Sequence, residues 1–289
     1  MIERLCVIGV GLIGGSVAQS ARQQGVCCEI VGVDHDEVNL EKAQHLSVID
    51  FSATNIQDAV AGADFVVIAT PVGTIEKILT ELKPDWPEDT IFTDVGSTKN
   101  SVVQSLRQVF GSVPSNFIPG HPIAGSESSG VEASIPSLFR NKRVIITPDE
   151  NSNRVMVEQV ERFWTMLGAT VSKMDVHRHD TILAATSHLP HIVAYALTDM
   201  LGQKDENNEI FKYAAGGFKD FTRIASSDPT MWLDICLANR GEIVGLIEQL
   251  IGELDGVAKN LKNNETEELF GVFSRANSAR RRFLNQYQN

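Results

Sequence analysis

A glycine pattern near the start of the chain restricts the fold more than any other part of the sequence. A short apolar run leads into Gly9, Gly11 and Gly14, which follow the G-x-G-x-x-G spacing. The first glycine permits a tight turn, the second lets the backbone approach a pyrophosphate, and the third lets a helix pack on a strand. Leu12 and Ile13 fall at the start of that helix, whose free N–H groups would face an anion. The pattern predicts a dinucleotide site, although glycine clusters also form ordinary turns.

A second apolar run, residues 29–33, ends at Asp34. A dinucleotide-binding fold has an acid at about this position, where it binds the ribose hydroxyls of the adenosine. A carboxylate here would repel a 2′-phosphate, so the sequence favours NAD over NADP. The alternative is a turn residue that opens the next predicted helix, residues 37–45, and the spacing favours the ribose role.

Composition excludes several classes of partner. The chain has 289 residues, 43% of them hydrophobic, and a net charge of −12 with 25 Lys and Arg that are scattered. A nucleic-acid partner needs a basic field, and none is present. The four cysteines have no C-x-x-C spacing, which favours a reducing cytoplasm. We expect no membrane span, because the N-terminal apolar run is short and broken by glycine.

The order of predicted elements indicates an α/β fold with two domains. Strands alternate with helices up to residue 173, which is typical of a Rossmann-type, doubly wound parallel sheet. We predict an NAD-binding domain at 1–173 and an all-helical substrate and dimerisation domain at 174–289. Residues 4–16 are predicted to form a buried strand that turns sharply into a helix, and the other predicted strands are residues 29–33, 64–69, 90–94, 116–118, 142–147 and 169–172. The predicted helices are residues 37–45, 74–82, 98–110, 153–167, 180–201, 209–215, 229–261 and 266–285, with a surface turn at 202–208.

The long predicted helix at 229–261 carries apolar residues at spacings of three and four. They form either one face of a bundle within the chain or a contact between subunits. A helical domain of this size gains much of its burial by pairing with a copy of itself, so we expect a homodimer.

Three polar turns follow predicted strand ends, where ligands of parallel sheets bind. The first contains Thr70 and Pro71, which we expect at the cofactor. The second contains Ser97, for which two compatible roles are open: it orients a reacting hydroxyl or the histidine, and it caps the following helix. The third is a Pro-Gly-His-Pro turn that presents His121. Because histidine titrates near neutrality, His121 is the candidate general base.

The helical region contributes candidate substrate contacts. His188 and His191 lie three residues apart with Pro190 between them. Their spacing also suits a metal, but no third ligand is evident and hydride transfer needs none, so we predict no metal site. Arg223 is the candidate clamp for a carboxylate, because its planar fork donates two hydrogen bonds, and the alternative is a surface ion pair. Trp232 belongs to either the core or a pocket wall.

Five motifs together resemble the prephenate/arogenate (cyclohexadienyl) dehydrogenase family of tyrosine biosynthesis. They are residues 9–16, 94–99, 120–125, 187–191 and 216–225, in that order along the chain. The last three in combination are quite specific. Lys219 stands where many members have arginine, a departure that leaves the chemistry intact.

This resemblance implies an NAD-dependent oxidoreductase that oxidises prephenate to 4-hydroxyphenylpyruvate with loss of CO2. His121 would be the catalytic histidine and Ser97 the serine that positions it. The residues implied at the substrate are Arg223, His188, His191 and Gly217. Arogenate, which would give tyrosine directly, is the alternative substrate, and a catalytically silent NAD-binding sensor is a rival from another class. Since we expect the whole chain to be dehydrogenase, any inhibition by tyrosine is expected at the active site.

Overall fold

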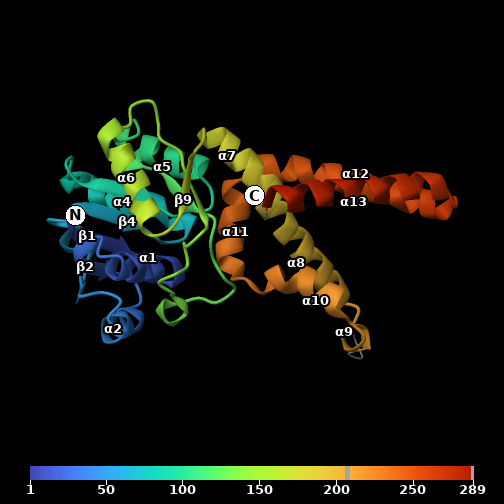
Figure 1. The fold of residues 1–289 in the computed structure, drawn as a ribbon, viewed down its shortest axis with the longest axis horizontal. Helices are drawn as coiled ribbons and strands as arrows, with labels where there is room; N and C mark the ends of the chain where they lie inside the picture. Colours follow the sequence, from blue (N-terminus) through green and yellow to red (C-terminus); the bar gives the residue numbers. More distant parts are fainter. Residues whose placement is uncertain (206–208, 288–289) are drawn as a thin grey trace. The chain divides into compact units, whose positions relative to one another are not determined.

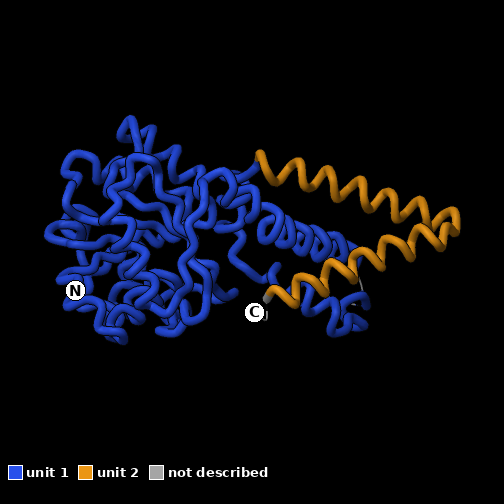
Figure 2. The backbone as a smooth tube through the Cα atoms, turned by 45° about the horizontal axis from the view of Figure 1, so that its top comes forward, with its two compact units in different colours: residues 1–240 blue, residues 241–289 orange. Residues whose placement is uncertain are grey.

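The computed structural model describes residues 1–205 and 209–287. They form two compact units, residues 1–240 and residues 241–289, which Figure 2 distinguishes by colour. Within the described ranges, no helix is both long enough and apolar enough to cross a bilayer.

The first unit is built around a six-stranded parallel sheet with the strand order β3-β2-β1-β4-β5-β6 (Figure 1). The strands are β1 (Ile2–Ile8), β2 (Cys27–Val33), β3 (Phe51–Ser52), β4 (Phe65–Ile68), β5 (Ile91–Asp94) and β6 (Phe117–Ile118). The predicted doubly wound sheet is therefore confirmed. The order reverses between β1 and β4, and a crevice for ligands opens beyond the carboxyl ends of strands at such a switch point.

Helices cover both faces of this sheet because successive strand side chains point to opposite sides. Val7 of β1 joins the core beneath α1, α2 and α6, whereas its neighbour Cys6 joins the core beneath α3, α4 and α5. The helices are α1 (Leu12–Gln23), α2 (Glu37–His45), α3 (Ile56–Val60), α4 (Ile75–Leu82), α5 (Asn100–Phe110) and α6 (Arg154–Met166). Short 3-10 turns supplement them at η1 (Val72–Thr74), η2 (Lys83–Asp85) and η3 (Val131–Ala133).

Three further strands form a separate sheet, β7 (Gly120–Pro122), β8 (Arg143–Ile146) and β9 (Thr170–Lys173). β7 pairs antiparallel with β8, so that His121 lies opposite Ile145. Two expectations were wrong here: the strand predicted at 142–147 does not join the parallel sheet, and His121 lies on a short strand rather than in a turn. Strand propensity indicates that a segment is extended but does not choose its partner.

The rest of the first unit is helical. It contains α7 (Val176–Leu183), the π-helical segment η4 (Ala184–His188), α8 (Leu189–Gly202), α9 (Glu209–Lys212), α10 (Gly216–Thr222), the 3-10 turn η5 (Arg223–Ser226) and α11 (Pro229–Ala238). Asp228 caps α11, because its carboxylate accepts the Met231 N–H at 2.8 Å. The motif at 216–225 lies within α10 and η5 and is therefore helical. The predicted turn at 202–208 lies partly outside the described residues.

The second unit consists of α13 (Thr266–Tyr287) and most of α12 (Arg240–Lys262), and it forms a helical hairpin (Figure 2). The single helix predicted at 229–261 is wrong, since it breaks at Asn239 into α11 and α12. Large apolar side chains stay exposed on both helices of the hairpin. Among them are Leu254 (58%), Leu261 (60%), Phe270 (73%) and Phe273 (60%).

Candidate active site

The glycine motif follows the carboxyl end of β1 and packs against the residues that follow β4. Gly9 has φ +91°, and a Cβ there would lie 2.8 Å from the Ala69 carbonyl oxygen and from the Thr70 side chain. A Cβ on Gly14 would overlap the Gly9 carbonyl oxygen, so both positions require glycine. Gly11 instead faces open space, with nothing within 4 Å of a Cβ. It begins α1 without a side-chain cap, which leaves N–H groups there for an anion.

Asp34 lies at the end of β2 with its carboxylate turned toward the glycine motif. Its Oδ2 accepts the Val10 N–H at 2.8 Å, and its Oδ1 accepts the Asp36 N–H at 3.1 Å. Leu12 and Ile13 are half-buried at the start of α1. The parts that the sequence predicts for a dinucleotide therefore meet at one edge of the sheet.

The turns that follow β4 and β5 are neighbours. Thr70 is half-buried and Pro71 exposed in the first turn, and a Cβ on Gly96 in the second would lie 2.8 Å from the Val72 side chain. Ser97 is half-buried in this second turn. The predicted cofactor residues after β4 thus lie beside the turn that carries Ser97.

Ser97 does not cap the helix that follows it, which corrects that prediction. α5 begins at Asn100, and the carboxylate of Asp180 on α7 accepts the N–H groups of Lys99 (2.8 Å) and Asn100 (2.9 Å). A carboxylate is favoured at a helix N-terminus by the free N–H groups and the helix dipole. The cap of α5 therefore comes from a residue 80 positions away in the chain.

Lys99 faces neither phosphate nor solvent. It is fully buried with Asp94, and its ammonium donates to the Asp94 carboxylate and, at 2.6 Å, to the Gly120 carbonyl oxygen. Asp94 in turn accepts the Gly120 N–H at 3.1 Å. Burial lowers the pKa of Lys99, and the neighbouring Asp94 opposes that shift. The two charged side chains hold both backbone polar groups of Gly120, the residue directly before His121.

His121 is the first member of a buried hydrogen-bonded chain. Its Nδ1 lies 2.9 Å from Nε2 of His179, and Nδ1 of His179 lies 2.7 Å from Oδ1 of Asp180. An ionised carboxylate only accepts, so His179 carries its proton on Nδ1 and its Nε2 accepts from His121. This network assigns the lone pair of His121 to Nε2, the nitrogen that is available to a substrate.

The surroundings set the protonation states of His121 and Asp180, the two ends of this hydrogen-bonded network. Burial, followed by the neighbouring His179, lowers the pKa of His121 well below 6.5, so its imidazole is neutral at pH 7. Burial alone would raise the pKa of Asp180, but the hydrogen bonds from His179 and from the start of α5 outweigh it and lower that pKa. A neutral base and an ionised acceptor thus lie in one network.

A second histidine joins the same network through Asn239. The Asn239 amide donates to the Asp180 carbonyl oxygen at 2.9 Å and lies 3.1 Å from Nδ1 of His188. The side chain of Asn239 is thus bonded to residues of α7 and η4. These bonds explain why the predicted long helix breaks at Asn239. His188 is 1% exposed, and burial lowers its pKa to about 4. With Nδ1 accepting from Asn239, its Nε2 carries a proton and has no partner among the described residues.

The π-helical turn that carries His188 has a local cause. Pro190 has no N–H and its ring disfavours a regular α-turn, so the helix widens over Ala184–His188. His191, on the next turn, stacks on Trp232 of α11 with ring centroids 3.7 Å apart. Trp232 is 8% exposed and also meets His188 edge-on. Trp232 therefore belongs to the buried core and also contacts the rings of both histidines.

Arg223 and Gly217 lie apart from this histidine network. Arg223 begins η5, and its exposed guanidinium pairs with Glu127 in the segment that follows β7. Gly217 is exposed on α10, with nothing within 4 Å of a Cβ. In the described part of the chain, no hydrogen bond or ion pair joins either residue to His121 or His188. The same residues contain no group of three or more His, Cys, Asp or Glu that is arranged for a metal ion.

Two family descriptions match nearly the whole chain. "Prephenate dehydrogenase, nucleotide-binding domain" matches residues 17–173, and "Prephenate dehydrogenase, dimerization domain" matches residues 175–275. The chain belongs to the prephenate dehydrogenase family.

Individual members of the prephenate dehydrogenase family agree with this assignment. The prephenate dehydrogenase of Bacillus subtilis is 37% identical over 97% of this chain and 76% of its own length. The cyclohexadienyl dehydrogenase of Zymomonas mobilis is 32% identical over 97% and 96% of the two chains. The structure of prephenate dehydrogenase from A. aeolicus, in complex with hydroxyphenyl propionate and NAD+, superimposes with a TM-score of 0.90 at 36% identity, covering 98% and 99% of the chains.

Sequence reasoning on this prephenate dehydrogenase family member missed His179, Asp180 and Asn239. The predicted helix start at Asp180 is wrong, because α7 begins at Val176, after its cap Asp175. One signal was present: two adjacent titratable residues lie on a helix that carries apolar Val176 and Leu183 on its packed face.

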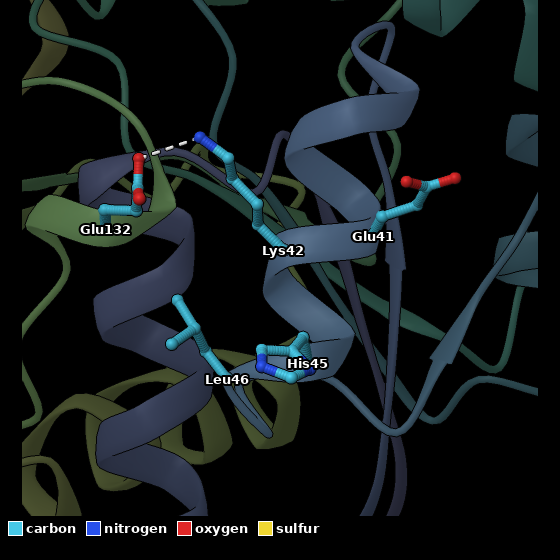
Figure 3. A pocket seen from close by; sticks show the side chains of 5 residues that line it. All are labelled: Glu41, Lys42, His45, Leu46 and Glu132. Carbon is cyan, nitrogen blue, oxygen red and sulfur yellow. Dashed lines mark hydrogen bonds and ion pairs between the residues drawn. The ribbon is translucent and has the colours of Figure 1, made fainter.

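A surface pocket lies between α2 and η3. It is lined by Glu41, Lys42, His45, Leu46 and Glu132. In Figure 3 the Lys42 side chain reaches across to Glu132, and the two charges are 2.9 Å apart. The pocket is open to solvent, and its Lys42 and Glu132 charges are paired within the chain.

Proposed function

We propose that this protein is an NAD-dependent prephenate dehydrogenase. It oxidises prephenate to 4-hydroxyphenylpyruvate, with transfer of a hydride to NAD and loss of CO2. The observation that carries the proposal is a buried, neutral His121 with its lone pair on Nε2, in a chain 36% identical to an enzyme solved with NAD+ and hydroxyphenyl propionate. A base of this kind suits removal of a hydroxyl proton at neutral pH.

The chain's own residues would do three things during the reaction. His121 Nε2 accepts the ring hydroxyl proton, and Ser97 orients that hydroxyl from the adjacent turn. The Asp94–Lys99 pair keeps the His121 backbone fixed through Gly120. NAD, when bound, supplies the hydride acceptor. Catalysis thus rests on positioning and general base action, and aromatisation of the ring drives the loss of CO2.

The cofactor is held at the crevice between β1 and β4. The open space at Gly11 and the uncapped start of α1 fit a pyrophosphate, and Asp34 fits the ribose hydroxyls. The residues proposed to bind NAD are Gly9, Gly11, Leu12, Ile13, Gly14, Asp34, Thr70 and Pro71. Since Asp34 would repel a 2′-phosphate, we expect a preference for NAD over NADP.

The substrate's carboxylates meet the helical region. We assign Arg223 as a carboxylate clamp, since its guanidinium is 63% exposed and retains donors beyond the pair with Glu127. His188 offers the unpartnered Nε2–H, and His191 is fixed by Trp232 and by the Ser187 carbonyl oxygen at 2.8 Å. Gly217 would form a backbone wall of the same pocket.

Replacing Arg223 by alanine should chiefly weaken substrate binding. We expect KM for prephenate to rise roughly 10–100-fold with a smaller change in kcat, because a carboxylate clamp acts in the ground state as well. Initial rates at saturating NAD measure both constants. Arg178→Ala, which removes an exposed arginine of α7, is the matched control and should leave KM unchanged. An unaltered KM in Arg223→Ala removes this residue from the site.

The helical part is proposed to form a homodimer. The match to a dimerisation domain and the exposed apolar side chains of α12 and α13 support this assembly. We also propose a division into domains at 1–173 and 174–289, which follows the limits of the two family matches. Light scattering at micromolar concentration tests the dimer, and a monomer contradicts it. All four cysteines are free, which supports a reducing cytoplasm as the location.

Initial rates of NADH formation test the function directly. Purified protein is assayed with prephenate and with arogenate, each with NAD and with NADP. Turnover of prephenate with NAD is the expected result, and a higher kcat/KM for arogenate would reassign the substrate. Measurable NAD binding without turnover of either compound would overturn the proposed function in favour of a silent NAD-binding protein.

Tyrosine is proposed as an inhibitor that acts at the active site. It shares the phenol ring and a carboxylate with the product, so the groups that hold the substrate would also hold tyrosine. Inhibition competitive with prephenate is the expected pattern. Inhibition that is non-competitive with prephenate contradicts an active-site mode.

A further inference from the structure

This inference rests on the proposed function and concerns the fate of one proton. Prephenate, a dianion, loses a hydride and CO2 and leaves as the 4-hydroxyphenylpyruvate monoanion, so the overall conversion neither releases nor consumes a proton. The hydroxyl proton that the base removes must therefore return to the same oxygen when the ring becomes aromatic. The site therefore borrows one proton and returns one proton in each turnover, with no net exchange with water.

The borrowed proton has little access to water at this site. His121 is 8% exposed, His179 is 0% exposed and Asp180 is 2% exposed. The three side chains form an unbroken line of hydrogen bonds of 2.9 and 2.7 Å. A proton taken at one end of the line can therefore be stored along it without leaving the protein.

We propose that His179 holds the borrowed proton, with Asp180 as its counter-ion. As the substrate O–H bond breaks, an N–H bond forms at His121 Nε2. The Nδ1–H bond of His121 then breaks and a bond forms at Nε2 of His179, which becomes an imidazolium paired with the Asp180 carboxylate. Both transfers reverse when the product oxygen takes the proton back.

The charges around the two rings favour storage on His179. Burial lowers the pKa of both histidines, and Lys99 lowers both further. Only His179 donates a hydrogen bond to a carboxylate, that of Asp180, and this bond opposes the lowering of its pKa. The buried Asp94 carboxylate also favours the charged form of His179, whereas His188 acts against a charge on His121. The imidazolium is thus stabilised one ring away from the reacting atoms.

The tautomers of the two histidines test this arrangement in the unaltered full-length protein. Histidine labelled with nitrogen-15 is observed by NMR at neutral pH, and the signals are assigned with the His121→Asn and His179→Gln variants. We expect His121 and His179 both to carry their proton on Nδ1, the less common form of free neutral histidine. A proton on Nε2 of His179 overturns the relay, because that nitrogen could then accept nothing from His121.

The His179→Gln variant tests the storage step. Its amide oxygen can still accept from His121 Nδ1–H, but it cannot take the proton. We expect kcat to fall roughly 10²-fold with KM for prephenate little changed. We also expect the acid limb of the kcat/KM profile to move to lower pH, because the pair binds its first proton on His179 and His121 alone binds a proton less readily.

His177→Gln is the matched control, since it makes the same change at an exposed position of α7 and should alter neither rate nor pH profile. A slower His179→Gln variant with an unmoved acid limb indicates a merely structural role and overturns the proposal, as does an unchanged kcat. If this variant does not fold, the tautomers of the unaltered protein decide. Absence of turnover in the unaltered protein overturns the proposed function, whereas turnover with Nε2-protonated His179 overturns the relay alone.

Discussion

The His121→Asn variant is expected to turn over prephenate about 10²–10⁴-fold more slowly than the unaltered protein while still binding NAD. Asparagine fits the same position on β7 and can still donate a hydrogen bond toward His179, but it cannot accept a proton from the substrate. The glycine motif that is proposed to bind NAD lies on other strands, so cofactor affinity should persist. Stopped-flow or steady-state rates measure the first effect, and fluorescence titration with NADH measures the second.

The surface pocket supplies a control for this experiment. His45→Asn makes the same substitution at an exposed histidine of α2, and turnover should be unchanged. Turnover of His121→Asn within twofold of the unaltered protein would remove His121 from the mechanism. Loss of NAD binding together with turnover would instead point to damage of the fold.

The second large effect concerns stability. Lys99→Met is expected to lower the free energy of unfolding by about 3–5 kcal/mol, because it leaves the Asp94 carboxylate buried without its counter-charge. The methionine also cannot donate to the Gly120 carbonyl oxygen, which adds an unsatisfied polar group beneath β7. Urea or guanidinium unfolding followed by circular dichroism measures the change.

Two comparisons identify the cause of that loss. Lys77→Met removes an 82% exposed lysine whose Glu81 partner lies 3.9 Å away, and it should cost less than about 1 kcal/mol. The double variant Asp94→Asn with Lys99→Met removes both buried charges, and it should be more stable than the sum of the single changes predicts, by about 1–3 kcal/mol. Strict additivity of the two single changes contradicts a coupled buried pair.

The sequence was sufficient for features that depend on local pattern. The glycine spacing, the run that ends at Asp34 and the alternation of apolar strands with helices predicted the parallel sheet. The Asp228-Pro229 cap was likewise readable, because an N-cap carboxylate and the proline at the first helical position are adjacent in the chain.

Features that depend on distant partners were not readable. Asp180 caps α5 from 80 residues away, His179 meets His121 from 58 residues away, and Asn239 meets His188 from 51 residues away. Two of these bonds, those of Asp180 and Asn239, override a local preference. Ser97 would otherwise have capped the helix, and Asn239 would have continued one. Periodicity within a window carries no information about such pairs, so the buried relay behind His121 emerged only from the three-dimensional arrangement.

The carboxylate of Asp180 also bears on how far the two halves of this chain are interchangeable. It lies beyond the proposed domain boundary at residue 173, yet it completes the helix that follows β5 and faces the partner of His121. Consider a chimera that joins residues 1–173 to the helical half of another family member. The residue at the position of Asp180 would decide whether the pKa of the base His121 is preserved. The nucleotide-binding half is thus not a self-sufficient module, and recombination within the family is constrained to exchange Asp180 together with the strand that bears the histidine.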